Sequence, residues 1–170
     1  MKKLFMILPL VLLFCFTFSC QKAEEVAEEP AVDVEAEKQA IRDLLAHYVS
    51  AITAGDIDAW YALFTEDAVF MPPNDETMEG REEVRKLASS FFETFHIEFE
   101  QTIDDVEVFG DWGFARWHCK ARYTPKAGGE TILENVKEVW IFKRQDDDSW
   151  KCSLVIWNSN DPLPTSQENQ

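Results

Sequence analysis

The sequence contains few positively charged residues: 16 lysines and arginines stand against 32 aspartates and glutamates, which gives a net charge of -16. Such an excess of negative charge repels the phosphate backbone of nucleic acids and the anionic headgroups of lipids. The composition therefore argues against nucleic-acid binding. It also argues against a basic surface patch that would hold the protein on a membrane.

Metal-binding patterns are missing as well. The four cysteines and three histidines form no CxxC or HxH pair, and His47, His96 and His118 are scattered along the chain. Zinc and other transition metals are held by several such side chains, usually with some of them at short spacing. We therefore predict no metal site and no cofactor, and we interpret the histidines as surface or core residues.

The N-terminal apolar run, from Leu4 to Phe18, is too short to cross a bilayer, which needs roughly 18 or more apolar residues. Two lysines precede this run, and the small residue Ser19 follows it, directly before Cys20. A positive start, a short apolar core and a small residue at the cut indicate a secretory signal.

A cysteine directly after the cut resembles the lipobox of bacterial lipoproteins, in which that thiol receives the lipid. The chain departs from this pattern at Thr17, where leucine is preferred. The resemblance implies a signal peptide over 1–19 and a lipid on Cys20, so that the lipid alone would anchor the protein. It places the protein in the bacterial cell envelope, facing the periplasm. An ordinary cleaved signal and a simple apolar anchor are the alternatives.

Composition divides the rest of the chain into three parts. Residues 20–34 are acidic, contain Pro30 and have no aromatic residue to bury, which is typical of a disordered tether. Residues 161–170 contain two prolines among polar residues and are predicted to be a disordered tail. The remaining residues, 35–160, are predicted to form one domain with one core.

A disulfide between Cys119 and Cys152 is allowed in an exported protein, but their spacing favours buried free thiols.

Within this domain, helical spacing comes first and strand alternation follows. The pattern predicts helices over 35–54, from Asp56 through Phe64 and over 81–95, and strands over 68–71, 97–109, 113–124, 130–144 and 150–158. Gly55 suits the end of the first helix, and Asp56 can cap the second. In the strand over 113–124, apolar residues alternate with basic ones, so one face is buried and the other is in water. Helices followed by antiparallel strands predict an α+β fold.

The stretch AHYVSAITAGDIDAWYALFTED, residues 46–67, resembles the SnoaL-like and DUF4440 proteins, which belong to the ketosteroid isomerase branch of the NTF2-like superfamily. Gly80-Arg81-Glu82 and the closing WKCSLVIWNSNDP are similar to the same proteins, so the resemblance covers the domain over 35–160. It implies an NTF2-like cone, in which three N-terminal helices pack on a strongly bent, mainly antiparallel sheet. Between the helices and the sheet lies a mostly apolar pocket.

The resemblance also implies where an isomerase would keep its catalytic groups. In that enzyme a tyrosine and a protonated acid donate hydrogen bonds to the enolate oxygen, and a carboxylate base moves the proton. Tyr48 matches the tyrosine, eight residues before Asp56, but Pro72 stands at the position of the base. The SnoaL-like pattern also has an acid near Val155, where this chain is apolar. These two departures favour ligand holding over acid–base catalysis.

The second donor is expected in the stretch KEVWIF, where Glu138 is the nearest acid. Strand alternation favours an inward Glu138 beside Trp140, and an aromatic environment would then raise the pKa of the carboxyl. Two alternatives stay open. Glu138 can instead face water and pair with a lysine, and Tyr48 can instead pack in the core with its hydroxyl on a protein acceptor.

We therefore predict a domain that binds a small, mainly apolar molecule without assigned catalysis. The candidate pocket residues are Tyr48, Trp60, Phe64, Phe70, Phe91, Phe95, Trp117, Glu138 and Trp140. The first alternative is an isomerase, dehydratase or hydrolase that acts on a carbonyl compound with Tyr48 and Glu138. The second is a protein-interaction module that forms a homodimer through apolar residues on the outer sheet face, namely Phe114, Val139 and Ile141.

Overall fold

The computed structural model describes residues 33–162, which contain three helices and one six-stranded sheet. The predicted signal peptide over 1–19, the lipid-attachment residue Cys20, most of the predicted tether and residues 163–170 lie outside the described residues. In the described part of the chain, no helix is both long and apolar enough to span a membrane.

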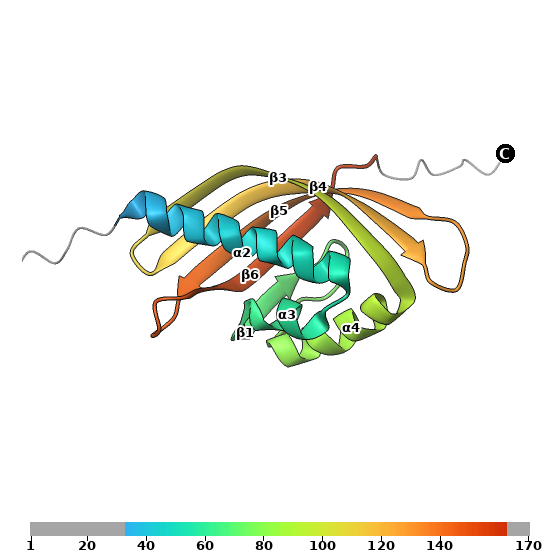
Figure 1. Cartoon of the computed structure of the whole chain (residues 1–170), viewed down its shortest axis with the longest axis horizontal. Helices are drawn as coiled ribbons and strands as arrows, with labels where there is room; N and C mark the ends of the chain where they lie inside the picture. The colour runs from blue at the N-terminus through green and yellow to red at the C-terminus, as the bar shows by residue number, and fades with distance from the viewer. Residues whose placement is uncertain (1–32, 163–170) are drawn as a thin grey trace, which may run out of the picture. The chain divides into compact units, whose positions relative to one another are not determined.

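The helices are α2 (Val34–Ala54), α3 (Ile57–Ala62) and α4 (Arg81–Thr94) (Figure 1). Helix α2 begins within the predicted tether, because the Asp33 side chain caps it by accepting a hydrogen bond of 3.2 Å from the Ala36 amide. It ends where predicted, before Gly55, whose φ of 70° is a left-handed conformation that glycine adopts without strain. Asp56 then caps α3 by accepting a 2.9 Å hydrogen bond from the Ala59 amide.

The strands are β1 (Phe64–Met71), β2 (Met78–Glu79), β3 (Phe95–Phe109), β4 (Trp112–Pro125), β5 (Ile132–Arg144) and β6 (Trp150–Ser159). Their order across the sheet is β2-β1-β6-β5-β4-β3. Strands β3 to β6 form an antiparallel meander, and β1 joins β6 in parallel. The predicted fold class is therefore confirmed: helices pack on a curved, mainly antiparallel sheet (Figure 1).

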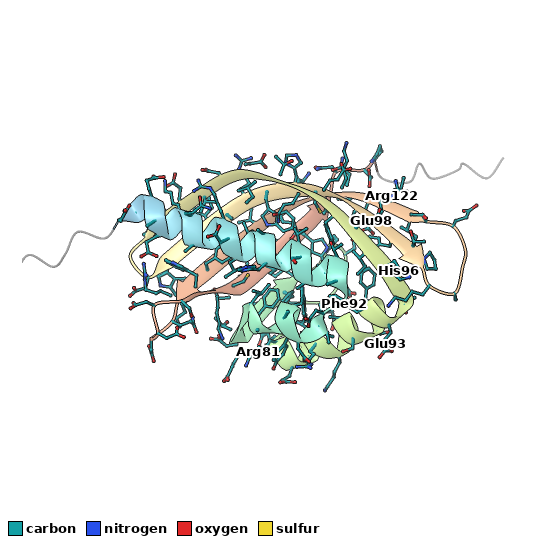
Figure 2. All side chains as sticks on the ribbon, in the orientation of Figure 1. Arg81, Phe92, Glu93, His96, Glu98 and Arg122 are labelled. Atoms are coloured by element: carbon teal, nitrogen blue, oxygen red, sulfur yellow. The ribbon has the colours of Figure 1, made fainter. Side chains whose placement is uncertain are left out.

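The core lies between the helices and one face of the sheet. Helix α2 packs against β3, β4 and β6, and α4 packs against β1, β2 and β3. Helix α4 buries Val84 and Phe92, which are eight residues apart and so lie on one face, whereas Glu93 is exposed (Figure 2). Cys119 and Cys152 are buried free thiols, as the spacing favours.

Some boundaries differ from the sequence prediction. Phe64 begins β1 instead of lying in the second helix, because α3 ends at Ala62 and Phe64 already pairs with Cys152 of β6. The two-residue strand β2 was not predicted, since so short a segment has no alternation to detect. Asp161, the first residue of the predicted tail, accepts a 3.2 Å hydrogen bond from the Asn135 amide and is therefore held beside β5.

Gly113 lies where α2 comes close to β4. A Cβ atom on Gly113 would lie 2.6 Å from Cδ1 of Ile41 and 3.1 Å from the carbonyl oxygen of Glu107. Because Ile41 is fully buried, its side chain cannot move into solvent. We expect Gly113→Ala to lower the free energy of unfolding by about 1–3 kcal/mol in urea titrations. The double variant Ile41→Val/Gly113→Ala removes the clashing atom and should lose less than the sum of the single changes; strict additivity would contradict the clash.

Candidate functional site

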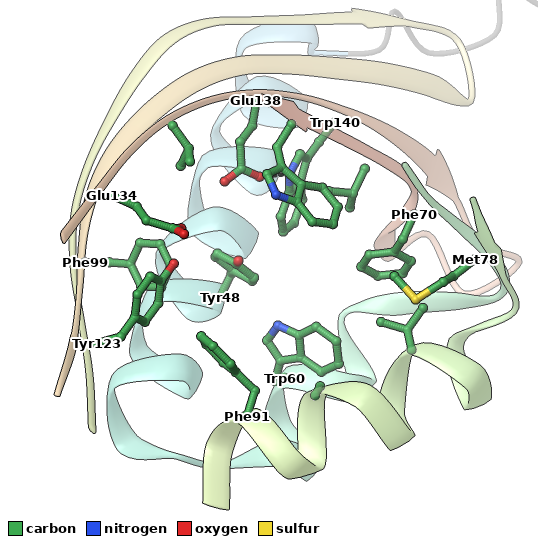
Figure 3. A pocket seen from close by; sticks show the side chains of 15 residues that line it. Tyr48, Trp60, Phe70, Met78, Phe91, Phe99, Tyr123, Glu134, Glu138 and Trp140 are labelled. Atoms are coloured by element: carbon green, nitrogen blue, oxygen red, sulfur yellow. Dashed lines mark hydrogen bonds between the residues drawn. The ribbon is translucent and has the colours of Figure 1, made fainter. Parts of the chain in front are cut away.

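A cavity of about 290 Å³ lies between the helices and the concave face of the sheet (Figure 3). Its wall is aromatic and aliphatic apart from two acidic residues. The lining residues are Tyr48, Trp60, Phe70, Met78, Val84, Ala88, Phe91, Phe99, Tyr123, Glu134, Val136, Glu138, Trp140, Val155 and Trp157. The volume is at the lower end of the range for ligand pockets, so the cavity suits a small molecule.

Six of the nine candidate pocket residues line this cavity: Tyr48, Trp60, Phe70, Phe91, Glu138 and Trp140. The other three do not. Phe64 and Trp117 are fully buried behind the wall, where Phe64 packs on Trp60 at 4.7 Å and Trp117 packs on Tyr48 at 5.9 Å between ring centroids. Phe95 lies at the start of β3, against Phe91 and Tyr123. Sequence periodicity identifies an inward face but does not separate a cavity wall from the packing behind it.

Glu138 projects from β5 into the cavity, so the inward alternative is correct. Only 7% of the residue is exposed, and its Oε2 accepts a 2.7 Å hydrogen bond from Nε1 of Trp140. Burial raises the pKa of Glu138 to about 8, and the hydrogen bond from Trp140 offsets part of that rise. The carboxyl is therefore mainly protonated at neutral pH. Oε2 accepts from Trp140, and Oε1 makes no hydrogen bond to another described residue, so a proton on Oε1 can be donated to a molecule in the cavity.

Tyr48 projects from α2 into the same cavity, where its ring packs edge-on against Trp140 at 4.6 Å (Figure 3). Burial, together with the nearby charge of an ionised Glu138, raises the pKa of Tyr48 well above its ordinary value. The hydroxyl makes no hydrogen bond to another described residue. Tyr48 and Glu138 thus bring two neutral hydrogen-bond donors into one cavity, and neither donates its proton to another described residue.

The acids that an isomerase would add are not in the wall. Pro72, at the position expected for the base, follows the end of β1 and does not line the cavity. Val155, where the SnoaL-like pattern has an acid, lines the cavity and is 3% exposed. The apolar substitution at Val155 therefore lies at the site itself and makes its wall less polar.

Several lining residues were not predicted, above all Glu134 and Tyr123. Both lie on strand faces that the alternation already identifies: Glu134 is four residues before Glu138 on β5, and Tyr123 shares the buried face of β4 with Trp117. Glu134 is exposed at the mouth of the cavity, as is Phe91. Strand alternation therefore already indicated that Glu134 faces the same way as Glu138. It was not considered because it lies outside KEVWIF.

Other reactive groups in the described residues lie apart from the cavity or are inert. Within residues 33–162, no three His, Cys, Asp or Glu side chains lie close enough together to hold a metal ion. His118 contacts Asp104 at 3.1 Å on the outer sheet face. Burial raises the pKa of the Cys119 and Cys152 thiols, which keeps them protonated and weakly nucleophilic. Polar chemistry in the cavity therefore depends on its tyrosines, its carboxyls and its indole N–H groups.

Several solved bacterial structures share this fold. A ketosteroid isomerase-like protein from Erwinia carotovora atroseptica SCRI1043 is 26% identical, with a TM-score of 0.67 over 74% of this chain and 98% of that protein. An NTF2-like superfamily protein from Salmonella enterica serovar Typhimurium LT2 is 16% identical, with a TM-score of 0.66 over 78% and 97%. A candidate scytalone dehydratase from Novosphingobium aromaticivorans DSM 12444 is 14% identical, with a TM-score of 0.66 over 75% and 90%. No curated protein is significantly similar in sequence.

The sequence also matches a family model for the SnoaL-like domain over residues 45–151, which is more than half of the chain. The matched segment runs from α2 to the start of β6 and contains both Tyr48 and Glu138. It overlaps two of the three motifs on which the resemblance rests and reaches the first residues of the third. The chain therefore belongs to the SnoaL-like domain family, and it shares its fold with an NTF2-like structure.

Proposed function

We propose that the domain binds a small, mainly apolar molecule in this cavity and holds one of its oxygen atoms between Tyr48 and Glu138. The convergence of these two donors on one cavity with apolar walls carries the proposal. Both groups are mainly neutral at neutral pH, because burial raises the pKa of Glu138 to about 8, and a tyrosine hydroxyl is neutral there even without the further rise that burial gives Tyr48. A carbonyl oxygen has two lone pairs and can accept from both donors at once.

The acids that are missing at Pro72 and Val155 favour binding of the ligand without its chemical conversion. Two donors stabilise a ketone or an enolate, but proton transfer also needs a base near the carbon that loses the proton. Neither Pro72 nor Val155, which stand where the resemblance expects acids, has a side chain that can accept a proton. The two positions where the resemblance expects an acid therefore favour recognition of a carbonyl compound over its isomerisation, and the second acid that does line the cavity, Glu134, lies at its mouth.

Tyr48→Phe is expected to weaken binding of an apolar ketone, such as 4-phenyl-2-butanone, between about two- and tenfold. The variant loses one hydrogen bond, worth about 0.5–1.5 kcal/mol, and keeps the ring that packs on Trp140. Isothermal titration calorimetry measures the affinity. Native mass spectrometry of protein purified from the cell envelope of its native host identifies any molecule that co-purifies.

Tyr61→Phe is the matched control for this variant. The Tyr61 hydroxyl donates to Glu82, and Tyr61 does not line the cavity, so the control also loses one tyrosine hydrogen bond but should bind the ketone normally. Equal affinities of Tyr48→Phe and the parent protein would remove the Tyr48 hydroxyl from the site.

An isomerase or dehydratase that uses Tyr48 and Glu138 is the second candidate, because the same convergence would stabilise an enolate. Such an enzyme would exchange the α-hydrogens of a bound ketone with solvent. Incubation of 4-phenyl-2-butanone in D₂O, followed by proton NMR, tests this exchange in the parent protein and in Glu138→Gln. Exchange no faster than in buffer, under conditions where the ketone is bound, rules out this chemistry for that ketone class.

We further propose that the domain is exported and held at the cell envelope by a lipid on Cys20.

A third candidate function is homodimer formation through the outer sheet face. On that face Phe114, Ile141 and Leu154 are neighbours on adjacent strands, and so are Val139 and Ile156. Sedimentation of residues 30–170 at high micromolar concentration tests for the dimer, and a monomer there counts against it.

A further inference from the structure

The mouth of the cavity combines a carboxylate with three aromatic rings. We call Glu134, Phe91, Phe99 and Tyr123 the mouth cluster; all four residues line the cavity. Tyr123 packs edge-on against Phe91 at 5.0 Å and against Phe99 at 6.3 Å between ring centroids. Figure 3 shows the Glu134 carboxylate and the Tyr123 hydroxyl side by side, both turned toward the cavity.

The Tyr123 hydroxyl lies beside the Glu134 carboxylate in the cavity (Figure 3). Burial, together with the negative charge of Glu134, raises the pKa of Tyr123 well above its usual range, so the hydroxyl is neutral and can donate to the carboxylate. A carboxylate beside a neutral hydroxyl and three aromatic rings makes a polar site at the mouth of a mainly apolar cavity.

No cationic residue among the described residues enters this cavity. Its fifteen lining residues include no lysine, arginine or histidine. Lys120 and Arg122 line a separate groove that Glu134 also borders, but they belong to the basic, outward face of β4, and Arg122 pairs with Glu98 at 3.3 Å (Figure 2). On the cavity side, the carboxylate of Glu134 thus lacks a positive partner.

We propose that the molecule bound in the cavity is an organic amine, whose ammonium group lies in the mouth cluster against Glu134. A positive charge is attracted by a carboxylate and by the negative faces of aromatic rings, an arrangement that proteins use to recognise alkylammonium groups. The apolar body of the amine then fills the inner cavity and brings an oxygen atom to Tyr48 and Glu138. The net charge of -16 also favours a cation and disfavours a carboxylate ligand. This inference rests on the proposed binding function and names its ligand class.

Two probes with one skeleton separate charge from shape: 3-phenylpropylamine, which is an ammonium ion at pH 7, and the neutral 3-phenylpropan-1-ol. Calorimetry should show the parent protein binding the amine about tenfold more tightly than the alcohol. Glu134→Gln should lose most of that preference while its affinity for the alcohol stays the same. Glu130→Gln is the matched control, since it removes an equal surface charge from a residue that does not line the cavity.

The possible results separate this proposal from the binding function on which it rests. Equal affinity for the amine and the alcohol, or a preference for the amine that survives in Glu134→Gln, overturns the ammonium site while apolar binding stands. Equal losses in Glu134→Gln and Glu130→Gln would assign the preference to overall charge and also overturn the site. Failure of the amine, the alcohol and 4-phenyl-2-butanone to bind would overturn both proposals.

Discussion

Glu138→Gln is expected to remove a steep loss of stability that the parent protein shows as the pH rises from about 5 to 8. Burial raises the pKa of Glu138 from 4.5 to about 8 in the folded protein. Between these two values the unfolded chain has lost the proton and the folded protein has kept it. Unfolding therefore releases a proton, and the free energy of unfolding falls by a little over 1 kcal/mol for each pH unit, about 4 kcal/mol over the window.

The sign of the effect follows from which state holds the proton. Below pH 4.5 the carboxyl is neutral in both states and adds no penalty, and the loss is complete once the pH has passed about 8. Glutamine has the same shape, can accept the hydrogen bond from Trp140 and never ionises. The variant should therefore match the parent near pH 5 and exceed its stability by several kcal/mol at pH 8.

Urea denaturation at intervals from pH 5 to pH 9 measures this difference directly. Glu130→Gln serves as the control, because it removes a carboxyl from the surface and leaves Glu138 in place, so it should retain the slope. A parent protein whose stability is flat over this range would show that the carboxyl is not buried as the structure has it.

Cys20→Ser is expected to release the protein from membranes. The Cys20 thiol is the atom that would carry the lipid, and acyl chains contribute about 0.8 kcal/mol per buried methylene to membrane binding. Without them, the acidic segment over 20–34 is repelled by an anionic membrane surface. Fractionation of cells that produce either form, with immunoblotting of membrane and soluble fractions, gives the answer. A serine variant that stays in the membrane fraction after normal signal cleavage would contradict the hypothesis that a lipid on Cys20 anchors the protein.

Much of the fold could be predicted because its signals are local. Gly55 and Asp56 mark the corner between two helices, and alternation over residues 113–124 identifies the buried face of β4. The parallel pairing of β1 with β6 could not be predicted, since neither strand carries information about a partner more than eighty residues away. The same limit explains Phe64, which was assigned to a helix although its strand pairing is with Cys152.

The inner part of the cavity wall was predicted, and the residues at its mouth were mostly missed. Tyr48 and Glu138 were identified because the resemblance points to donors and strand alternation turns Glu138 inward. Which aromatic residues face empty space and which face each other depends on how the helices lie over the bent sheet. For this reason Trp117 was placed in the wall although it is fully buried behind it. Glu134 was missed because it lies outside KEVWIF, the stretch in which the resemblance places the second donor, although it borders the cavity.

The strand order has a consequence for how the domain assembles. Strands β3 to β6 pair with their neighbours in sequence, so each hairpin can close as soon as its second strand exists. Strand β1 is made before all of them, yet its long pairing partner is β6, the last strand among the described residues. The cavity draws Phe70 from β1 and Trp157 from β6. A chain that stops before β6 therefore leaves β1 paired only with the two-residue strand β2 and leaves the cavity without one wall, so the cavity is complete only when β6 has been made.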